Sequence, residues 1–175
     1  VIRIEKCAFY NCLNLKRIEF TKDSKLQTIE EDALSLSPIE SISIPSEVTD
    51  LKDGWCSRTH KLTKISVSPS NPRYCCLDEK MIIGKSSIES TNYDCLVFCV
   101  RNIKNITIPN YIKYICPYAF EKSLIESIII SPEVIMIGRN AFSDCENLQQ
   151  IEFAKDSKLQ TIEEDAFGST LIERI

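Results

Sequence analysis

Two segments of the chain carry almost the same sixteen residues. "IEFTKDSKLQTIEEDA" occupies residues 18–33 and "IEFAKDSKLQTIEEDA" occupies residues 151–166. The two copies differ at one position only, where Thr21 corresponds to Ala154. A chain of 175 residues that carries one segment twice is built from repeats, so its fold has to be one that stacks similar units.

Four columns of residues recur along the chain at a fixed spacing. Each repeat starts at an apolar anchor, and the anchors are Ile4, Ile29, Leu51, Ile115, Ile137 and Ile162. Five residues later stand Phe9, Leu34, Cys56, Phe120, Phe142 and Phe167. Eight residues after the anchors stand Cys12, Ser37, Thr59, Ser123, Cys145 and Thr170. Thirteen or fourteen residues after them stand Ile18, Ile42, Ile65, Ile128, Ile151 and Ile175.

The steps between successive anchors are 25, 22, 64, 22 and 25 residues. A period of 22 to 25 residues lies within the range of leucine-rich repeats. We therefore expect an α/β repeat solenoid, a right-handed coil with a parallel β-sheet on one face and short helical or turn segments on the other. One coil buries little surface alone, but stacked coils join their apolar residues into a continuous core.

Every repeat contains a short stretch in which apolar and polar residues alternate, which predicts a strand with one buried face. The stretches are "LKRIEF", "IESISI", "LTKISV", "IKNITI", "IESIII" and "LQQIEF". Proline follows several of them and cannot donate to a strand ladder, so the strand ends there. These prolines are Pro45, Pro69, Pro109 and Pro132.

The step of 64 residues contains an interruption over residues 68–105. Residues 81–83 and 96–100 have the composition of two strands joined by the polar turn "GKSSIESTNYD", which predicts an inserted β-hairpin. The hairpin either replaces a coil as scaffold, the interpretation we favour, or is a decoration that binds a ligand.

The repeats predict a single solenoid over residues 1–175. Residues 1–67 hold repeats 1 to 3, residues 68–109 form the irregular hairpin-bearing module, and residues 110–175 hold repeats 4 to 6, the last of them truncated. Because the chain starts without Met and ends within a repeat, we expect a fragment of a longer chain.

Composition excludes several classes of function. The chain has 25 acidic and 21 basic residues and no basic stripe, which argues against nucleic acid as a partner. The longest apolar runs, such as "CLVFCV", are of strand length, so this segment is not expected to insert into a membrane.

The nine cysteines do not form a recognisable framework. Their number is odd, no CxxC pair occurs and the chain has one histidine, so neither a disulfide scaffold nor a metal site is expected. Cys12 and Cys145 share a column with Ser and Thr, which predicts small side chains that hydrogen-bond backbone groups. A disulfide within the hairpin module, among Cys75, Cys76, Cys95 and Cys99, stays open.

No catalytic residues or cofactor are expected, and we predict that the chain is not an enzyme. His60 lies in the polar connector "SRTHKL" without an acidic or nucleophilic partner nearby. None of the four glycines forms a phosphate-binding loop, and the acidic "IEEDA" turns are solvated faces. The sequon at Asn105 lies on a predicted strand, where a glycan would cover the sheet, so we give it little weight.

The outward side of the strands is the best candidate for a binding site, because extended sheet surfaces are the usual binding faces of solenoids. The residues beside each inward Ile must point outward. This outward strip comprises Arg17, Glu19, Ser41, Ser43, Lys64, Ser66, Asn105, Thr107, Ser127, Ile129, Gln150 and Glu152, and continues to Arg174. The alternative is that these polar residues only keep the sheet soluble.

The repeats resemble the BspA-like leucine-rich repeat family. The family pattern "IPxxVxxIgxxAFxxCxxLxxIxI" is visible in "ISPEVIMIGRNAFSDCENLQQIEF" and "IPSEVTDLKDGWCSRTHKLTKISV". "SVSPSNPRYCCLDEKMIIG" resembles the hairpin-bearing module of many members, and the "KDSKLQTIEEDAF" joint resembles forms found in parasitic protists. Trp55-Cys56 and Leu34 depart from the pattern, which predicts a distorted third coil.

The resemblance implies a function. Members of the family are typically cell-surface or secreted proteins that adhere to host cells and extracellular matrix, so we expect a protein-binding module of a surface adhesin. The alternative is an intracellular, cytoplasmic scaffold that binds a signalling protein, because nine reduced cysteines suit a reducing compartment.

Overall fold

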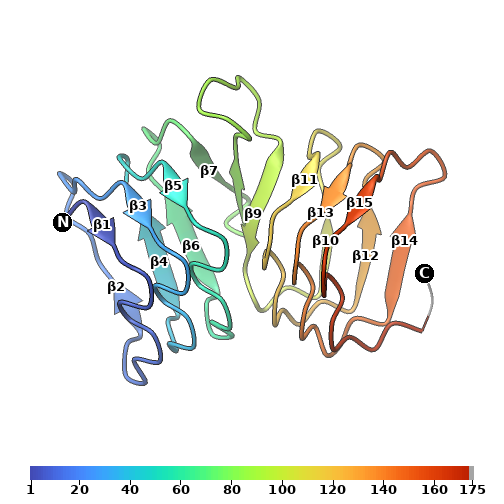
Figure 1. Ribbon diagram of the computed structural model, residues 1–175, viewed down its shortest axis with the longest axis horizontal. Helices are drawn as coiled ribbons and strands as arrows, with labels where there is room; N and C mark the ends of the chain where they lie inside the picture. The colour runs from blue at the N-terminus through green and yellow to red at the C-terminus, as the bar shows by residue number, and fades with distance from the viewer. Residues whose placement is uncertain (174–175) are drawn as a thin grey trace.

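The computed structural model describes residues 1–173 and shows a solenoid of about seven turns that runs from the N-terminus on one side to the C-terminus on the other (Figure 1). The strands form two rows. The upper row holds β1 (Arg3–Ile4), β3 (Thr28–Ile29), β5 (Asp50–Leu51), β7 (Tyr74–Leu77), β8 (Met81–Gly84), β9 (Cys95–Cys99), β11 (Tyr114–Ile115), β13 (Met136–Ile137) and β15 (Thr161–Ile162). The lower row holds β2 (Arg17–Ile18), β4 (Ser41–Ile44), β6 (Lys64–Val67), β10 (Asn105–Thr107), β12 (Ser127–Ile130) and β14 (Gln150–Phe153).

Both rows are divided near the middle of the chain. The upper row consists of the sheet β1-β3-β5 and the sheet β7-β8-β9-β11-β13-β15, and the lower row consists of β2-β4-β6 and β10-β12-β14. All strand pairs between coils are parallel, whereas β8 pairs antiparallel with both β7 and β9. The expectation of one sheet on one face was therefore too simple, since every regular coil contributes one strand to each row.

The expected helical segments are absent, and residues 1–173 contain no helix. The segments that follow the anchors are turns in which the third and seventh residues have positive φ, as in Asp32 (55°) and Leu36 (59°). A right-handed helix needs negative φ at every residue, so a left-handed residue every fourth position prevents it. The α/β class predicted from the sequence is wrong in its helical part.

A ladder of backbone hydrogen bonds holds these turns together. Each residue of the phenylalanine column donates its backbone N–H to a carbonyl in the next coil. The acceptor is the residue that directly precedes the phenylalanine column of that coil. Phe9 donates to Ala33 (2.8 Å), Phe120 to Ala141 (2.7 Å) and Phe142 to Ala166 (2.7 Å). The turns thus satisfy their backbone groups by stacking, as strands do.

The phenylalanine column also stacks within the core. The rings of Phe120 and Phe142 lie 4.7 Å apart at 8°, and those of Phe142 and Phe167 lie 5.2 Å apart at 13°. Phe120 and Phe142 are fully buried. Equal spacing in the sequence therefore becomes a continuous aromatic stack along the solenoid axis.

The β8–β9 pair is the hairpin that the sequence predicts, and it divides the core in two. Ile82 and Phe98 belong to the apolar cluster of the N-terminal coils, whereas Met81, Ile83 and Leu96 belong to that of the C-terminal coils. Strand neighbours point to opposite faces, so a hairpin buried on both faces serves both clusters. It is part of the scaffold rather than a decoration.

The third coil keeps its turn despite its departures from the pattern. Leu34 still donates to the carbonyl of Trp55 (2.9 Å). Trp55 is large where other coils have Ala, Cys56 is small where they have Phe, and the Trp55 ring packs 5.9 Å from Phe98 of the hairpin. The exchange roughly conserves volume, so the predicted distortion toward the second coil does not occur.

On its other side, the third coil meets the fourth through a carboxylate. Glu121 is buried and accepts hydrogen bonds from the Ser57 hydroxyl (3.1 Å) and the Arg58 backbone N–H (2.7 Å). The fully buried Arg101 donates to the carbonyls of Ala119 (3.0 Å) and Tyr118 (3.3 Å). The Glu121 carboxylate thus joins the coils before and after the hairpin, and Arg101 braces the turn that carries it.

Candidate ligand-binding face

The outward strip lies on the lower row. In β4, Ile42 and Ile44 are buried while Ser43 is exposed, and in β12 Ile128 is buried while Ile129 is 58% exposed. The alternation read from the sequence therefore places inward and outward residues correctly. Arg174 and Ile175 lie outside the described residues.

The N-terminal half of the strip forms a grid on β2, β4 and β6. Arg17 pairs with Ser41 and Ser41 with Lys64, while Ser43 pairs with Ser66 in the next row. Glu19 follows β2 directly, and Arg17 Nε lies 3.2 Å from its Oε1. A shallow groove of about 490 Å³ covers this grid. We call it the N-terminal grid, defined by Arg17, Glu19, Ser41, Ser43, Lys64 and Ser66.

The C-terminal half forms a second grid on β10, β12 and β14. Its columns align Asn105 with Ser127 and Gln150, and Thr107 with Ile129 and Glu152. This C-terminal grid lines a groove of about 520 Å³, to which the β7–β8 turn adds Asp78 and Lys80. The hairpin module therefore contributes a side wall to this half of the face, which the N-terminal grid does not share.

The structure does not bring all the strip residues together. β6 and β10 are the terminal strands of separate sheets, and β6 packs beside β7 and β8 rather than beside β10. The hairpin module supplies three strands to the upper row, and the described chain has no lower-row strand between β6 and β10. The strip is thus two grids with a break between them, a division that periodicity alone did not reveal.

Polar contacts fix side chains of the C-terminal grid. The Ser127 hydroxyl donates to Asn105 Oδ1 (3.2 Å), and Gln150 Nε2 donates to Glu152 Oε1 (2.6 Å). These contacts orient the outward side chains before a partner arrives, which lowers the entropic cost of binding. The Asn105 amide of the sequon is exposed and carries this hydrogen bond.

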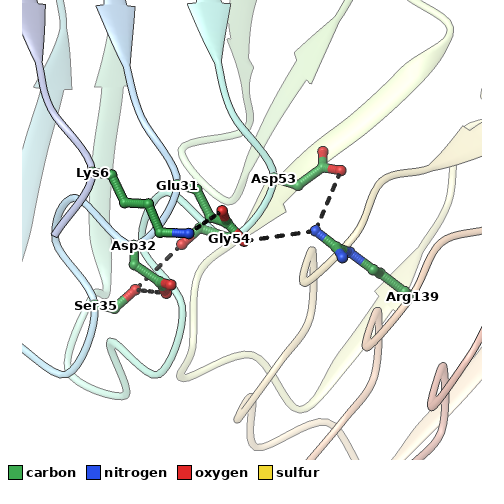
Figure 2. A network of polar contacts seen from close by, with 7 residues as sticks. All are labelled: Lys6, Glu31, Asp32, Ser35, Asp53, Gly54 and Arg139. Atoms are coloured by element: carbon green, nitrogen blue, oxygen red, sulfur yellow. Dashed lines mark hydrogen bonds and ion pairs between the residues drawn. The ribbon is translucent and has the colours of Figure 1, made fainter.

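A second polar surface, which no sequence pattern predicted, lies on the turns that follow the upper strands. Figure 2 shows Lys6 Nζ 2.7 Å from Glu31 Oε2, and Arg139 reaching across to Glu31 Oε1 (3.9 Å) and Asp53 Oδ2 (4.0 Å). The hydrogen bond and charge of Lys6 lower the pKa of Glu31. Burial raises the pKa of the Asp53 carboxyl, although Arg139 opposes this. Arg139 thereby links coils on opposite sides of the hairpin.

The small-residue column behaves as predicted at Ser37, Thr59 and Cys145, whereas Cys12 is only partly buried and bonds Ser37 Oγ through its backbone N–H. Ser37 Oγ donates to the Phe9 carbonyl (2.5 Å), Thr59 Oγ1 to that of Cys56 (2.6 Å), and Cys145 Sγ to that of Phe120 (3.0 Å). All nine cysteines are free thiols, so the hairpin disulfide left open by the sequence is not formed. Burial raises the pKa of the Cys56 and Cys99 thiols to about 12, which makes both inert at neutral pH.

The remaining chemistry offers little beyond these surfaces. His60 is exposed, and residues 1–173 hold no cluster of three or more His, Cys, Asp or Glu side chains that could bind a metal ion. Nor does this part of the chain have a helix with the length and apolar character needed to cross a bilayer.

The model of the BspA type leucine rich repeat region matches residues 1–94 and 73–175, with six copies. The chain belongs to this family. Proteins built from leucine-rich repeats commonly mediate protein–protein interactions, and their solenoid is typically non-enzymatic. A search of curated protein sequences found no match.

Solved structures confirm the leucine-rich repeat fold. A leucine rich cell surface protein from Faecalibacterium prausnitzii is 24% identical with a TM-score of 0.78, over 96% of this chain and 48% of that one. The pneumococcal vaccine antigen PcpA is 19% identical with a TM-score of 0.80, over 91% and 44%. A leucine-rich repeat protein from Eubacterium ventriosum is 16% identical with a TM-score of 0.54, over 99% and 75%.

The chain spans less than half the length of the first two of these proteins. All three come from bacteria, so the expected likeness to parasitic-protist forms finds no support. Identities below 25% carry the fold and not the ligand.

Proposed function

We propose that this chain is a non-enzymatic protein-binding module of a cell-surface or secreted adhesin, and that it binds host-cell or extracellular-matrix proteins through the outward strip. The observation that carries the proposal is the strip itself. Its twelve side chains, most of them exposed, lie in regular rows on two parallel sheets. Each half of the strip lines one groove. Family membership supports the class of function, and two of the similar structures belong to a cell surface protein and a vaccine antigen.

The geometry suits a protein surface better than a small molecule. Both grooves are shallow and open, and their floors are rows of mostly polar or charged side chains at the regular strand spacing. Small-molecule sites are usually concave and mostly apolar. An extended partner can contact many such weak positions at once, as partners of solenoids do.

One observation favours a second candidate. All nine cysteines are free, which suits a reducing compartment, so the alternative is an intracellular scaffold that holds a signalling protein on the same strip. Antiserum raised against the chain separates the two candidates. Labelling of intact source cells supports the surface adhesin, whereas labelling only after permeabilisation refutes it.

Binding itself is tested with immobilised fibronectin, laminin and collagen. Changing Ser43, Ser66, Thr107 and Ile129 together to Lys should abolish binding and leave the circular dichroism spectrum unchanged. A control variant adds Lys at Ser87 and Asn147, which are exposed and lie outside both grids. If the strip variant binds as well as the wild type, the strip is not the binding face.

A further inference from the structure

Two cysteines that the sequence did not pair lie against each other beside the hairpin. Cys95 is the first residue of β9, and Cys116 directly follows β11. The two strands are parallel neighbours in which Tyr114 pairs with Cys95. Because side chains alternate along a strand, Cys116, two residues beyond Tyr114, points to the same side of the sheet as Cys95.

The two side chains are close neighbours on this side of the sheet, and interaction with Cys95 raises the pKa of the Cys116 thiol. The Cys95 thiol in turn lies 3.7 Å from Asp94 Oδ1. Both cysteines line one small cavity of about 140 Å³, and Arg73 and Lys85 line the same cavity. Cys116 is only partly buried whereas Cys95 is buried, so a small reagent reaches the pair through Cys116.

Among the other cysteines of the hairpin and the core, the described part of the chain shows no such shared cavity. Cys56 and Cys99 are buried in the core, and Cys145 donates its thiol to the Phe120 carbonyl. Cys75 and Cys76 are consecutive in β7, so their side chains point to opposite faces of the strand.

We propose that Cys95 and Cys116 form a reversible modification site, which a low-molecular-weight disulfide of the glutathione class converts into a disulfide cross-link between β9 and β11. The thiolate of one cysteine attacks the oxidised reagent, forms a mixed disulfide and releases one reduced thiol. The thiolate of the second cysteine then attacks the protein sulfur of the mixed disulfide and releases the second reduced thiol. Two protons leave the protein, and two electrons pass to the reagent.

Position and charge both suit this reaction. A disulfide needs close approach of the two sulfurs with a defined geometry. Both cysteines stand at strand ends, where the chain adjusts more easily than in the middle of a sheet. Glutathione disulfide is anionic, and the basic residues Lys52, Arg73 and Lys85 outnumber the acidic Asp53 among the residues that line the cavity.

The cross-link would tie the last strand of the hairpin module to the first upper strand of the coils that follow it. It would close a loop over residues 95–116, and such closure stabilises mainly by restricting the unfolded chain. The proposal is independent of the ligand of the outward strip and holds for either compartment. An oxidising compartment would maintain the disulfide, and a reducing compartment would maintain the two free thiols.

The test starts with the reduced chain and oxidised glutathione at about pH 9, because the raised pKa of Cys116 leaves little thiolate at neutral pH. After incubation, free thiols are blocked with N-ethylmaleimide, and a non-reducing protease digest is analysed by mass spectrometry. We expect one cross-linked peptide pair that joins Cys95 to Cys116, with the other thiols blocked. The urea midpoint of unfolding should rise on oxidation and return with dithiothreitol.

Variants separate this pair from general oxidation. Cys116→Ser should lose both the cross-link and the rise in the midpoint, whereas the control Cys99→Ser, on the same strand β9, should keep both. Wild-type thiols that all stay free, stable glutathione adducts without a cross-link, or a cross-link between other cysteines would each overturn the proposal. The wild-type digest decides by itself if a variant fails to fold.

Discussion

The joint at Glu121 offers the sharpest test of how the two halves of the solenoid are held together. Its buried carboxylate accepts hydrogen bonds from Ser57 Oγ (3.1 Å) and Arg58 N (2.7 Å), at the point where the third coil meets the fourth. The change Glu121→Ala removes both acceptor contacts at once.

The size of the effect follows from three contributions. Leaving the buried Ser57 hydroxyl without its partner costs about 1–3 kcal/mol, and the part-buried Arg58 N–H costs less because water can reach it. Loss of packing adds about 1 kcal/mol. Relief from burying a carboxylate offsets part of this sum. We expect a net loss of roughly 2–4 kcal/mol in the free energy of unfolding.

Urea unfolding followed by circular dichroism measures this loss. With a slope of about 2 kcal/mol per molar urea, 3 kcal/mol moves the midpoint by roughly 1.5 M. The matched control is Glu126→Ala, because Glu126 is an exposed glutamate whose ion pair with Lys104 (2.9 Å) is worth at most about 1 kcal/mol. If the two variants lose the same stability, Glu121 does not hold the joint.

Three further predictions follow from burial, close approach and the thiol pair. Ile128→Ala should lower the free energy of unfolding in urea by about 2–5 kcal/mol because Ile128 is 2% exposed. Ile129→Ala, at a residue 58% exposed, should change it by less than about 0.5 kcal/mol, and equal losses would refute the alternation of inward and outward side chains along β12. Gly138→Ala places a Cβ 2.6 Å from the backbone N of Pro117, so a fall in the thermal midpoint is expected, and an unchanged midpoint would contradict the close approach. Interaction with Cys95, and then burial, raise the pKa of Cys116 well above its ordinary value, so its thiolate fraction is small at neutral pH. Thiol blocking of Cys116 should keep accelerating above about pH 9, where a thiol of ordinary pKa about 8.5 is already mostly ionised, and a rate that levels off near pH 9 would argue against the raised pKa.

The periodic part of this fold could be predicted because one column of the sequence becomes one line of contacts in space. The number of residues between Phe120, Phe142 and Phe167 corresponds to one turn of the solenoid, so their rings lie above one another and stack. In the same way, the alternation around Ile42 and Ile128 fixes which neighbours face outward. Local rules were sufficient wherever each coil repeats its neighbour.

The aperiodic part could not be predicted in the same way, since it depends on contacts between distant residues. Nothing in the order of residues says that Arg139 reaches Glu31 and Asp53 across the hairpin. The helical expectation failed for a related reason. Left-handed residues such as Leu36 are unfavourable in isolation, and the hydrogen-bond ladder between neighbouring coils compensates that cost.

The break between β6 and β10 changes how a ligand of the strip has to be sought. One continuous strip would offer an elongated partner equivalent positions along its length. Lys substitutions at different positions would then weaken binding to the same extent. Two grids predict separable effects. Lys at Ser43 and Ser66 tests the N-terminal grid, and Lys at Thr107 and Ile129 tests the C-terminal grid, whose wall holds Lys80. A partner that occupies one grid loses binding with one pair only. A partner that spans the break loses affinity with either pair. The loss can reach roughly 10²–10⁴-fold, because binding to one grid holds the partner at a high effective concentration near the other grid.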